Sequence, residues 1–119
     1  MYMASFVAQF DSLRYKLGAT ITNVYSMIGT PLLYPARLVM IDNLTNADLL
    51  ITTNSNLDQM VIPASTGRVI DVTSNTFNTN MSGIFTFPIG TAFYVKWIAG
   101  VPTNGKSVYI SVIYGSEQQ

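Results

Sequence analysis

The central part of the chain alternates short apolar runs with polar turns. Asn, Ser, Thr, Pro and Gly separate the runs, and these residues bond their own backbone, adopt positive φ or end a ladder. This spacing leaves no room for a crossover helix, so it predicts an antiparallel meander in an all-β chain. The four predicted strands of the meander are residues 37–41, 48–53, 59–62 and 68–72.

Period-two alternation is clearest near the C-terminus. Phe93, Val95 and Trp97 share one face of a predicted strand over residues 93–98. Val108, Ile110, Val112 and Tyr114 share one face of a second strand over residues 107–114. The dipeptide Asn104-Gly105 lies between the two runs and is a strong hairpin signal. We therefore predict that these two strands pair with each other.

Other segments complete the predicted fold. Residues 14–22 alternate between apolar and polar side chains, as in a strand with one solvent-exposed face. Residues 24–28 and 84–87 are predicted to be further short strands. Two prolines make residues 29–35 a loop or an edge passage, and residues 73–80 are an Asn-rich loop. With about eight strands, the chain is predicted to be one domain over residues 1–119, an antiparallel two-sheet sandwich or jelly roll. A small closed barrel is the alternative.

The N-terminal segment has a different pattern. Tyr2, Phe6 and Phe10 lie four residues apart, which suits one face of a short helix, but the same residues would serve in an extended arm. We expect residues 1–12 to be an arm or helix docked on its own chain, in preference to an arm exchanged with a neighbour. The segment lacks a basic leader before its apolar residues, so it is not expected to be a secretory signal.

Composition narrows the possible functions. The 119 residues are 49% hydrophobic and only 10% charged, whereas an ordinary domain has about a quarter charged residues. The low charge predicts either a surface made of Asn, Ser and Thr in place of Lys and Glu, or apolar surface that other chains cover, and both can hold at once. The absence of net charge also favours self-association. Zero formal net charge without a basic cluster argues against nucleic-acid binding, and no apolar run is long enough to span a membrane.

The inventory of catalytic side chains is small. The chain has no Cys and no His, which removes thiolate chemistry, the usual activating base for a serine nucleophile and most transition-metal ligands. Its few carboxylates show no pairing of the kind that a glycosidase needs, so we expect them to be solvated at turns and edges, and a small two-carboxylate hydrolase is a remote alternative. We predict no enzymatic activity and no cofactor.

Two binding sites were weighed against structural roles. Asp42, Asn43, Asn46 and Asp48 could supply oxygen ligands to Ca²⁺, but their spacing is that of turn caps, so no metal site is predicted. Trp97 could stack on a sugar, yet a lone Trp on an alternating strand is more often part of the core.

Several short segments of the chain carry a resemblance to a known family. They are Leu13-Arg14 and residues 18–22 (GATIT), 29–31 (GTP), 35–37 (PAR), 43–48 (NLTNAD), 90–96 (GTAFYVK) and 107–114 (SVYISVIY). In this order the segments resemble the small all-β virion proteins of tailed bacteriophages. The resemblance implies a structural subunit present in many copies in the virion, as a head decoration protein or as a fibre, collar or tail component.

The expected function is therefore a capsid decoration or cement protein that forms homo-oligomers and binds other virion proteins. A tail, collar or fibre component that binds a carbohydrate or receptor is the alternative. We expect the contacts to come from the N-terminal segment and from the loops at residues 29–35 and 100–105. Phe77 is either an anchor for its own loop, which we prefer, or an exposed contact. The predicted interface residues are Tyr2, Phe6, Phe10, Pro31, Tyr34, Pro35, Phe77 and Pro102.

Overall fold

The structure, a computed structural model, describes residues 5–72 and 86–118. These residues form two antiparallel sheets and one short 3-10 turn, which confirms the predicted all-β sandwich. The elements are β1 (Ser5–Phe10), β2 (Arg14–Leu17), η1 (Gly18–Thr20), β3 (Ser26–Met27), β4 (Ala36–Asn43), β5 (Leu49–Thr52), β6 (Met60–Ile62), β7 (Thr66–Asp71), β8 (Tyr94–Trp97) and β9 (Ser107–Gln118).

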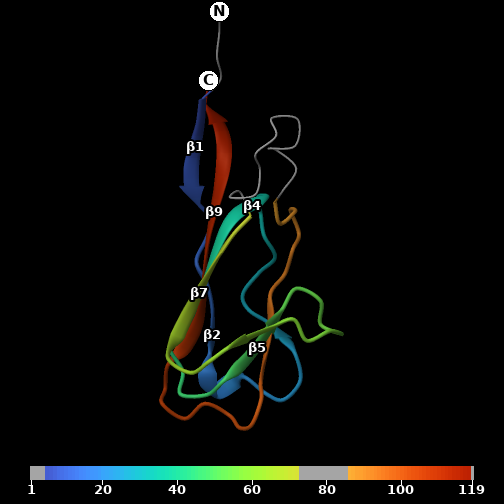
Figure 1. The fold of residues 1–119 in the computed structure, drawn as a ribbon, viewed down its shortest axis with the longest axis vertical. Helices are drawn as coiled ribbons and strands as arrows, with labels where there is room; N and C mark the ends of the chain where they lie inside the picture. The colour runs from blue at the N-terminus through green and yellow to red at the C-terminus, as the bar shows by residue number, and fades with distance from the viewer. Residues whose placement is uncertain (1–4, 73–85, 119) are drawn as a thin grey trace, which may run out of the picture.

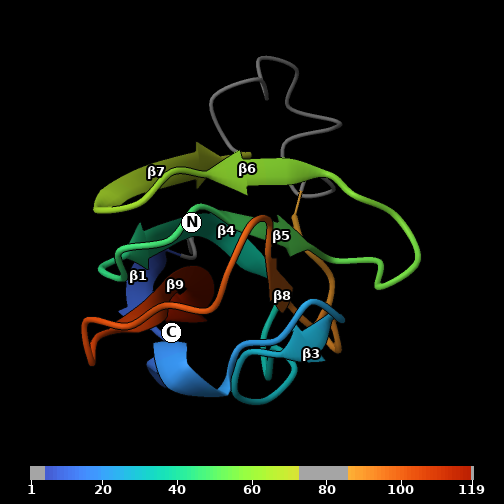
Figure 2. The same cartoon turned by 90° about the horizontal axis from the view of Figure 1, so that it is seen from below.

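The two sheets form two layers that face each other (Figure 2). In sheet A the strand order is β1-β9-β4-β7, and β2 also pairs with β9; in sheet B the order is β3-β8-β5-β6. Strand β9 organises sheet A because it is the longest strand, and β1, β2 and β4 all pair with it. Figure 1 shows that β1 and the C-terminal half of β9 extend together beyond the rest of the sandwich.

The core lies between the inner faces of the sheets, as the alternation predicts. Val108, Ile110 and Val112 on β9 are fully buried, whereas Tyr109 and Ile113 between and beyond them are only half-buried. The other fully or almost fully buried apolar side chains include Ile21, Ile28, Leu32, Ala36, Val39, Ile41, Leu49, Ile51, Ile62, Phe93 and Val95.

The predicted meander is correct for its two middle strands, since β5 and β6 pair antiparallel in sheet B. It is wrong for the outer two, because β4 pairs with β7 and β9 in sheet A. The polar segment after β4 is therefore not a hairpin turn but a crossing from one sheet to the other. Strand periodicity shows which residues face the core, but two strands with matching inner faces can lie side by side or face each other across it.

The predicted C-terminal hairpin is wrong for the same reason. Strand β8 pairs with β3 and β5, and β9 belongs to the opposite sheet. The connection is held at the end of the sandwich, where Thr103 N–H donates to Asn46 Oδ1 at 2.9 Å and Asn104 Nδ2 donates to the Leu44 carbonyl at 3.1 Å. Gly105 does adopt the positive φ, +75°, that an Asn-Gly turn predicts.

Smaller elements also differ from expectation. The N-terminal segment forms strand β1 rather than a helix, docked on β9 of its own chain. The strand predicted over residues 14–22 stops at Leu17 and continues as η1, because Ile21 N–H bonds back to the Gly18 carbonyl. The strand predicted at residues 24–28 contains only Ser26–Met27. Of residues 84–87, the first two lie outside the described residues, and Phe87 forms a single bridge with Ala36.

Candidate functional site

The outer face of sheet A, the side turned away from sheet B, is predominantly apolar. The strand register places Phe10 beside Ile113 and Ile113 beside Leu38 in one row across the sheet. Asp71 ends this first row beyond Leu38. A second row runs from Ser111 through Met40 to Val69, and a third from Tyr15 through Tyr109 to Asp42. An antiparallel sandwich usually presents polar side chains on such a face. This outer face is defined by Phe10, Tyr15, Leu38, Met40, Val69, Tyr109 and Ile113.

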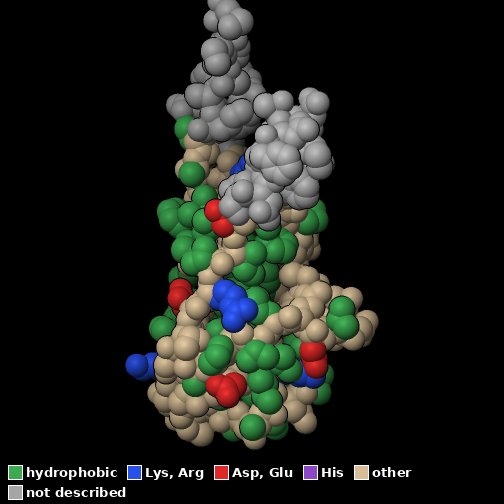
Figure 3. Space-filling model, viewed as in Figure 1, with side chains coloured by type: hydrophobic (Ala, Val, Ile, Leu, Met, Phe, Trp, Pro, Cys, Tyr) green, Lys and Arg blue, Asp and Glu red, His purple; other side chains and the backbone are tan. Residues whose placement is uncertain are grey.

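Several of these side chains have most of their surface in solvent. Phe10 is 70% exposed, Val69 62% and Tyr15 55%, while the remaining four are half-buried among their neighbours. Figure 3 shows the same character on the side of the molecule seen in Figure 1, where hydrophobic side chains spread widely and the charged ones form isolated spots. A contiguous apolar surface of this kind indicates contact with another protein surface.

A buried arginine fixes the loop at residues 29–35 on the core side of sheet A, because Arg14 pairs with Ile110, whose side chain lies in the core. The Arg14 side chain is only 1% exposed although it lies on strand β2. Its Nε donates to the Thr30 carbonyl at 2.5 Å, its Nη2 to the Pro31 carbonyl at 2.8 Å and its Nη1 to the Ser12 carbonyl at 2.7 Å. The guanidinium therefore satisfies backbone acceptors of a loop that has few ladder bonds of its own.

Asp11 completes this network. Its Oδ2 accepts from Arg14 Nη2 at 3.4 Å and from Leu33 N–H at 3.2 Å, and its Oδ1 accepts from Ser12 N–H at 2.6 Å. The side chain is 1% exposed, so the prediction that the carboxylates are solvated is wrong for Asp11. Burial of the charge is compensated by the guanidinium and by two backbone donors.

Tyr34 closes the other side of the same loop. Its ring stacks on Tyr114, with 4.0 Å between ring centroids and 10° between the planes. Tyr114 Oη donates to Gln9 Oε1 at 2.8 Å, which ties the loop to strand β1 as well. The residues that precede β2 and the loop before β4 therefore form one connected region.

The predicted interface residues fall into three groups. Phe10 lies on the outer face, and Pro31, Tyr34 and Pro35 are exposed in the loop that Arg14 holds. Pro102, in contrast, is buried next to Gly18, so its side chain presents little surface to a partner. The reason is that its loop docks on η1 instead of projecting. Phe6 lies in β1, where only its backbone is described, and Tyr2 and Phe77 lie outside the described residues.

The residues considered for Ca²⁺ have separate structural tasks. Asn43 is fully buried, and its Nδ2 donates to the carbonyls of Ala47, Ile62 and Pro63 at 2.9 to 3.2 Å. Asn46 bonds Thr103, and Asp48 accepts from Ala64 N–H. Within residues 5–72 and 86–118 no group of three or more His, Cys, Asp or Glu side chains converges on one point. The turn-cap interpretation of these residues agrees with their contacts.

A polar cluster lies on the exposed side of sheet B. Tyr25 Oη donates to Asp58 Oδ1 at 2.6 Å, Lys96 Nζ lies 3.4 Å from the same carboxylate, and Nζ is 4.7 Å from the Tyr25 ring centroid. Partial burial and the bond to Asp58 raise the pKa of Tyr25 to about 12. The bond from Tyr25, aided by Lys96, lowers the pKa of Asp58.

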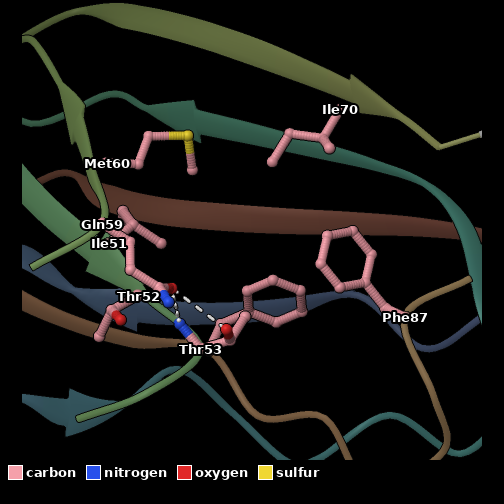
Figure 4. A pocket seen from close by; sticks show the side chains of 8 residues that line it. Ile51, Thr52, Thr53, Gln59, Met60, Ile70 and Phe87 are labelled. Atoms are coloured by element: carbon pink, nitrogen blue, oxygen red, sulfur yellow. Dashed lines mark hydrogen bonds between the residues drawn. The ribbon is translucent and has the colours of Figure 1, made fainter. Parts of the chain in front are cut away.

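Two of the hollows in the described part of the chain lie in the sandwich, and their polar side chains are already hydrogen-bonded. One, of about 180 Å³, opens between the sheets and is lined by Ile51, Thr52, Thr53, Gln59, Met60, Ile70, Phe87 and Phe93 (Figure 4). Its polar groups are engaged, because Gln59 Oε1 accepts from Thr53 N–H and Thr53 Oγ1. The other is a shallow depression near Asp48 and Thr103, where both side chains have partners.

Trp97 packs partly buried against the core, in agreement with the interpretation that it belongs to the core and does not stack on a sugar.

No known protein family, characterised protein or solved structure matches this chain. Among the residues that are described, no helix has the length and apolarity needed to cross a membrane.

The sequence analysis missed Asp11, Arg14 and the outer face as a unit. The face could not be seen because it is assembled from β1, β2, β4, β7 and β9, whose order in the sheet is not the order in the chain. One signal was available for Arg14, a charged residue between apolar Leu13 and Tyr15 and four residues before Gly18, but the same pattern also fits a solvated strand position.

Proposed function

We propose that this chain is a non-enzymatic structural subunit of a tailed-phage virion, a capsid decoration or cement protein that binds neighbouring virion proteins through the outer face of sheet A. The observation that carries the proposal is the exposure of Phe10, Tyr15 and Val69 on one sheet face. Removing such side chains from water contributes roughly 25 cal/mol for each Å² of apolar area. The free energy is gained only when a complementary surface covers the face.

Low charge supports the same proposal. Only 10% of the residues are charged and the formal net charge is zero, so long-range repulsion does not oppose close packing of many copies. The loop at residues 29–35, fixed by Arg14, adds a second contact area with exposed Pro31, Tyr34 and Pro35. A rigid loop loses little conformational entropy on binding, which favours its use as a contact.

The experiment compares two lysine variants in a binding assay with purified capsid shells and tail proteins of tailed phages. Val69→Lys places a charge on the outer face, and Val24→Lys is the control because Val24 is 67% exposed but lies between η1 and β3. We expect the natural chain to co-sediment with a capsid shell. Val69→Lys should weaken that binding at least about tenfold, which corresponds to about 1.4 kcal/mol of binding free energy. Val24→Lys should leave the binding unchanged. Absence of binding to every component, or equal effects of the two variants, would contradict the proposal.

A tail, collar or fibre component with a carbohydrate-binding role is the second candidate. The cluster of Tyr25, Asp58 and Lys96 favours it, because a sugar can stack on an aromatic ring and form hydrogen bonds with neighbouring charged groups. The Tyr25 ring is already covered by Lys96 Nζ, which counts against a carbohydrate-binding role. A glycan array, or a sugar-dependent change in Trp97 fluorescence, separates the candidates since the decoration protein should give neither signal.

A further inference from the structure

Strand β1 forms one edge of sheet A. It pairs with β9 on one side, and no strand of the described residues pairs with its other side. Figure 1 shows the β1–β9 pair extending away from the rest of the sandwich. Beyond Tyr114, which pairs with Ala36 at the start of β4, β9 keeps β1 as its neighbour and β4 no longer follows.

The free edge of β1 presents a defined set of backbone groups. Asp11 N–H donates to the Val112 carbonyl at 2.9 Å, so this residue pair is one of the closely hydrogen-bonded pairs of the ladder. Antiparallel pairs alternate, so Ser5, Val7 and Gln9 direct their N–H and C=O groups toward β9. Phe6, Ala8 and Phe10 then direct theirs outward, away from β9.

The edge also lacks the features that keep sheets from joining. Sheets usually protect an exposed edge with charged residues, Pro or a bulge. The sequence of β1, SFVAQF, contains no charged residue and no Pro, and its register with β9 runs without a shift. A two-stranded ribbon is moreover only marginally stable in water, so a further strand on this edge would add support.

We propose that β1 pairs in antiparallel fashion with β1 of a second copy of this chain, about a two-fold axis at Ala8. This register places Ala8 opposite Ala8 of the second copy and Phe10 opposite Phe6 of the second copy. All three outward-directed residues of each copy then exchange N–H···O bonds, and the two edges join into a four-stranded ribbon, β9-β1-β1-β9.

A second copy fits this edge better than an unrelated strand. The outward residues recur at every second position around Ala8, so the edge is its own complement under a two-fold rotation. It is uncharged, so the two copies do not repel each other. Antiparallel pairing also places the two sandwiches at opposite ends of the ribbon, because the β1–β9 pair extends from one end of each (Figure 1). The inference deepens the proposed function by naming one partner, and rests on it only for the expectation that the chain self-associates.

Cysteine cross-linking tests the register, since the natural chain has no Cys. Ala8→Cys should give a disulfide dimer under mild oxidation, because the Cα atoms of such a pair lie about 5.5 Å apart. Phe10→Cys is the matched control on the same strand, since its two copies would lie about four residues or roughly 14 Å apart along the ladder. It should not cross-link alone but should do so when mixed with Phe6→Cys.

Light scattering tests the interaction itself. We expect the natural chain to be a dimer, Ala8→Pro to be monomeric with an unchanged β circular-dichroism spectrum, and Ala8→Thr to remain dimeric. Proline is tolerated where the replaced N–H points away from the sheet, so Ala8→Pro keeps the β1–β9 ladder. If Ala8→Pro does not fold, the cross-linking pattern decides alone.

The outcomes also separate this inference from the proposed function. A dimer that persists in Ala8→Pro, or cross-linking of Phe10→Cys alone as fast as Ala8→Cys, overturns edge pairing without affecting capsid binding. A natural chain that stays monomeric at concentrations of about 1 mM, well above common dissociation constants, overturns it as well. A dimer with the predicted cross-links that binds no virion component supports edge pairing and removes the proposed function.

Discussion

Gly29 packs directly on the side chain of Arg14. A Cβ atom at position 29 would lie 2.9 Å from both Cβ and Cγ of Arg14, closer than nonbonded carbon atoms approach, and the φ of Gly29 is +65°. Both conditions require glycine. The contact seats the loop at residues 29–35 on a buried guanidinium, and this seating holds Pro31 and Tyr34 at the surface.

We expect Gly29→Ala to destabilise the fold through two separable effects. Positive φ costs an L-residue about 1 to 2 kcal/mol, and overpacking against Arg14 should add about 1 to 3 kcal/mol. Gly105→Ala is the control, because Gly105 also has positive φ but an added Cβ there meets no atom within 4 Å. Urea unfolding of both variants measures the difference. Equal losses of unfolding free energy would show that contact with Arg14 contributes nothing.

The sequence predicts faces better than partners. Val108, Ile110 and Val112 are buried where the alternation places them, and β6 ends before Pro63 as predicted. Glycine is a poorer boundary signal in this chain, because β7 contains Gly67 and β9 runs past Gly115 to Gln118. The hairpin at Asn104-Gly105 fails because a local turn signal does not determine whether its two flanking strands bond to each other. That choice depends on contacts such as Thr103 with Asn46, between residues far apart in the chain.

The burial of charged and amide side chains is a second feature that the sequence did not predict. Asp11 and Asn43 have the residue types of solvated turns, yet both are buried with specific partners. Their burial depends on backbone groups that the fold brings near, at Leu33 for Asp11 and at Ile62 for Asn43. Period and propensity contain no information on such distant partners.

The buried amide of Asn43 joins the two sheets where the chain crosses between them. Its Nδ2 donates to three carbonyls and its Oδ1 accepts from the N–H and Oγ1 of Thr45. Asn43→Ala should lower the free energy of unfolding by about 2 to 4 kcal/mol, since several buried polar groups lose partners that each stabilise by about 1 kcal/mol or more.

Asn43→Asp should be more damaging than Asn43→Ala despite its similar shape. The variant replaces a donor with a carboxylate oxygen that faces three carbonyl oxygens, and a buried uncompensated charge costs about 3 to 5 kcal/mol. Urea unfolding of both variants tests the order, and lowering the pH should reduce the gap because protonation restores a donor. An Asp variant as stable as the natural chain would show that the amide donor is not needed at this position.

The cluster of Tyr25, Asp58 and Lys96 predicts a measurable pH dependence. With the pKa of Tyr25 raised from 10 to about 12, the folded state holds the phenol proton more tightly than the unfolded state does. The contribution of Tyr25 to stability is therefore fully present below pH 10 and is lost as the pH rises toward 12. The difference between natural chain and Tyr25→Phe in near-ultraviolet absorbance should show the phenolate appearing near pH 12.

Asp58→Asn separates the causes of this shift. Burial is the largest cause and the interaction with Asp58 comes second, so the variant should lower the pKa of Tyr25 without returning it to 10. Asp42→Asn is the control, because Asp42 is an exposed carboxylate on β4 in the other sheet. A full return to 10 in Asp58→Asn would assign the shift to the carboxylate alone, and an unchanged midpoint would show that the bond between Tyr25 and Asp58 does not persist in solution.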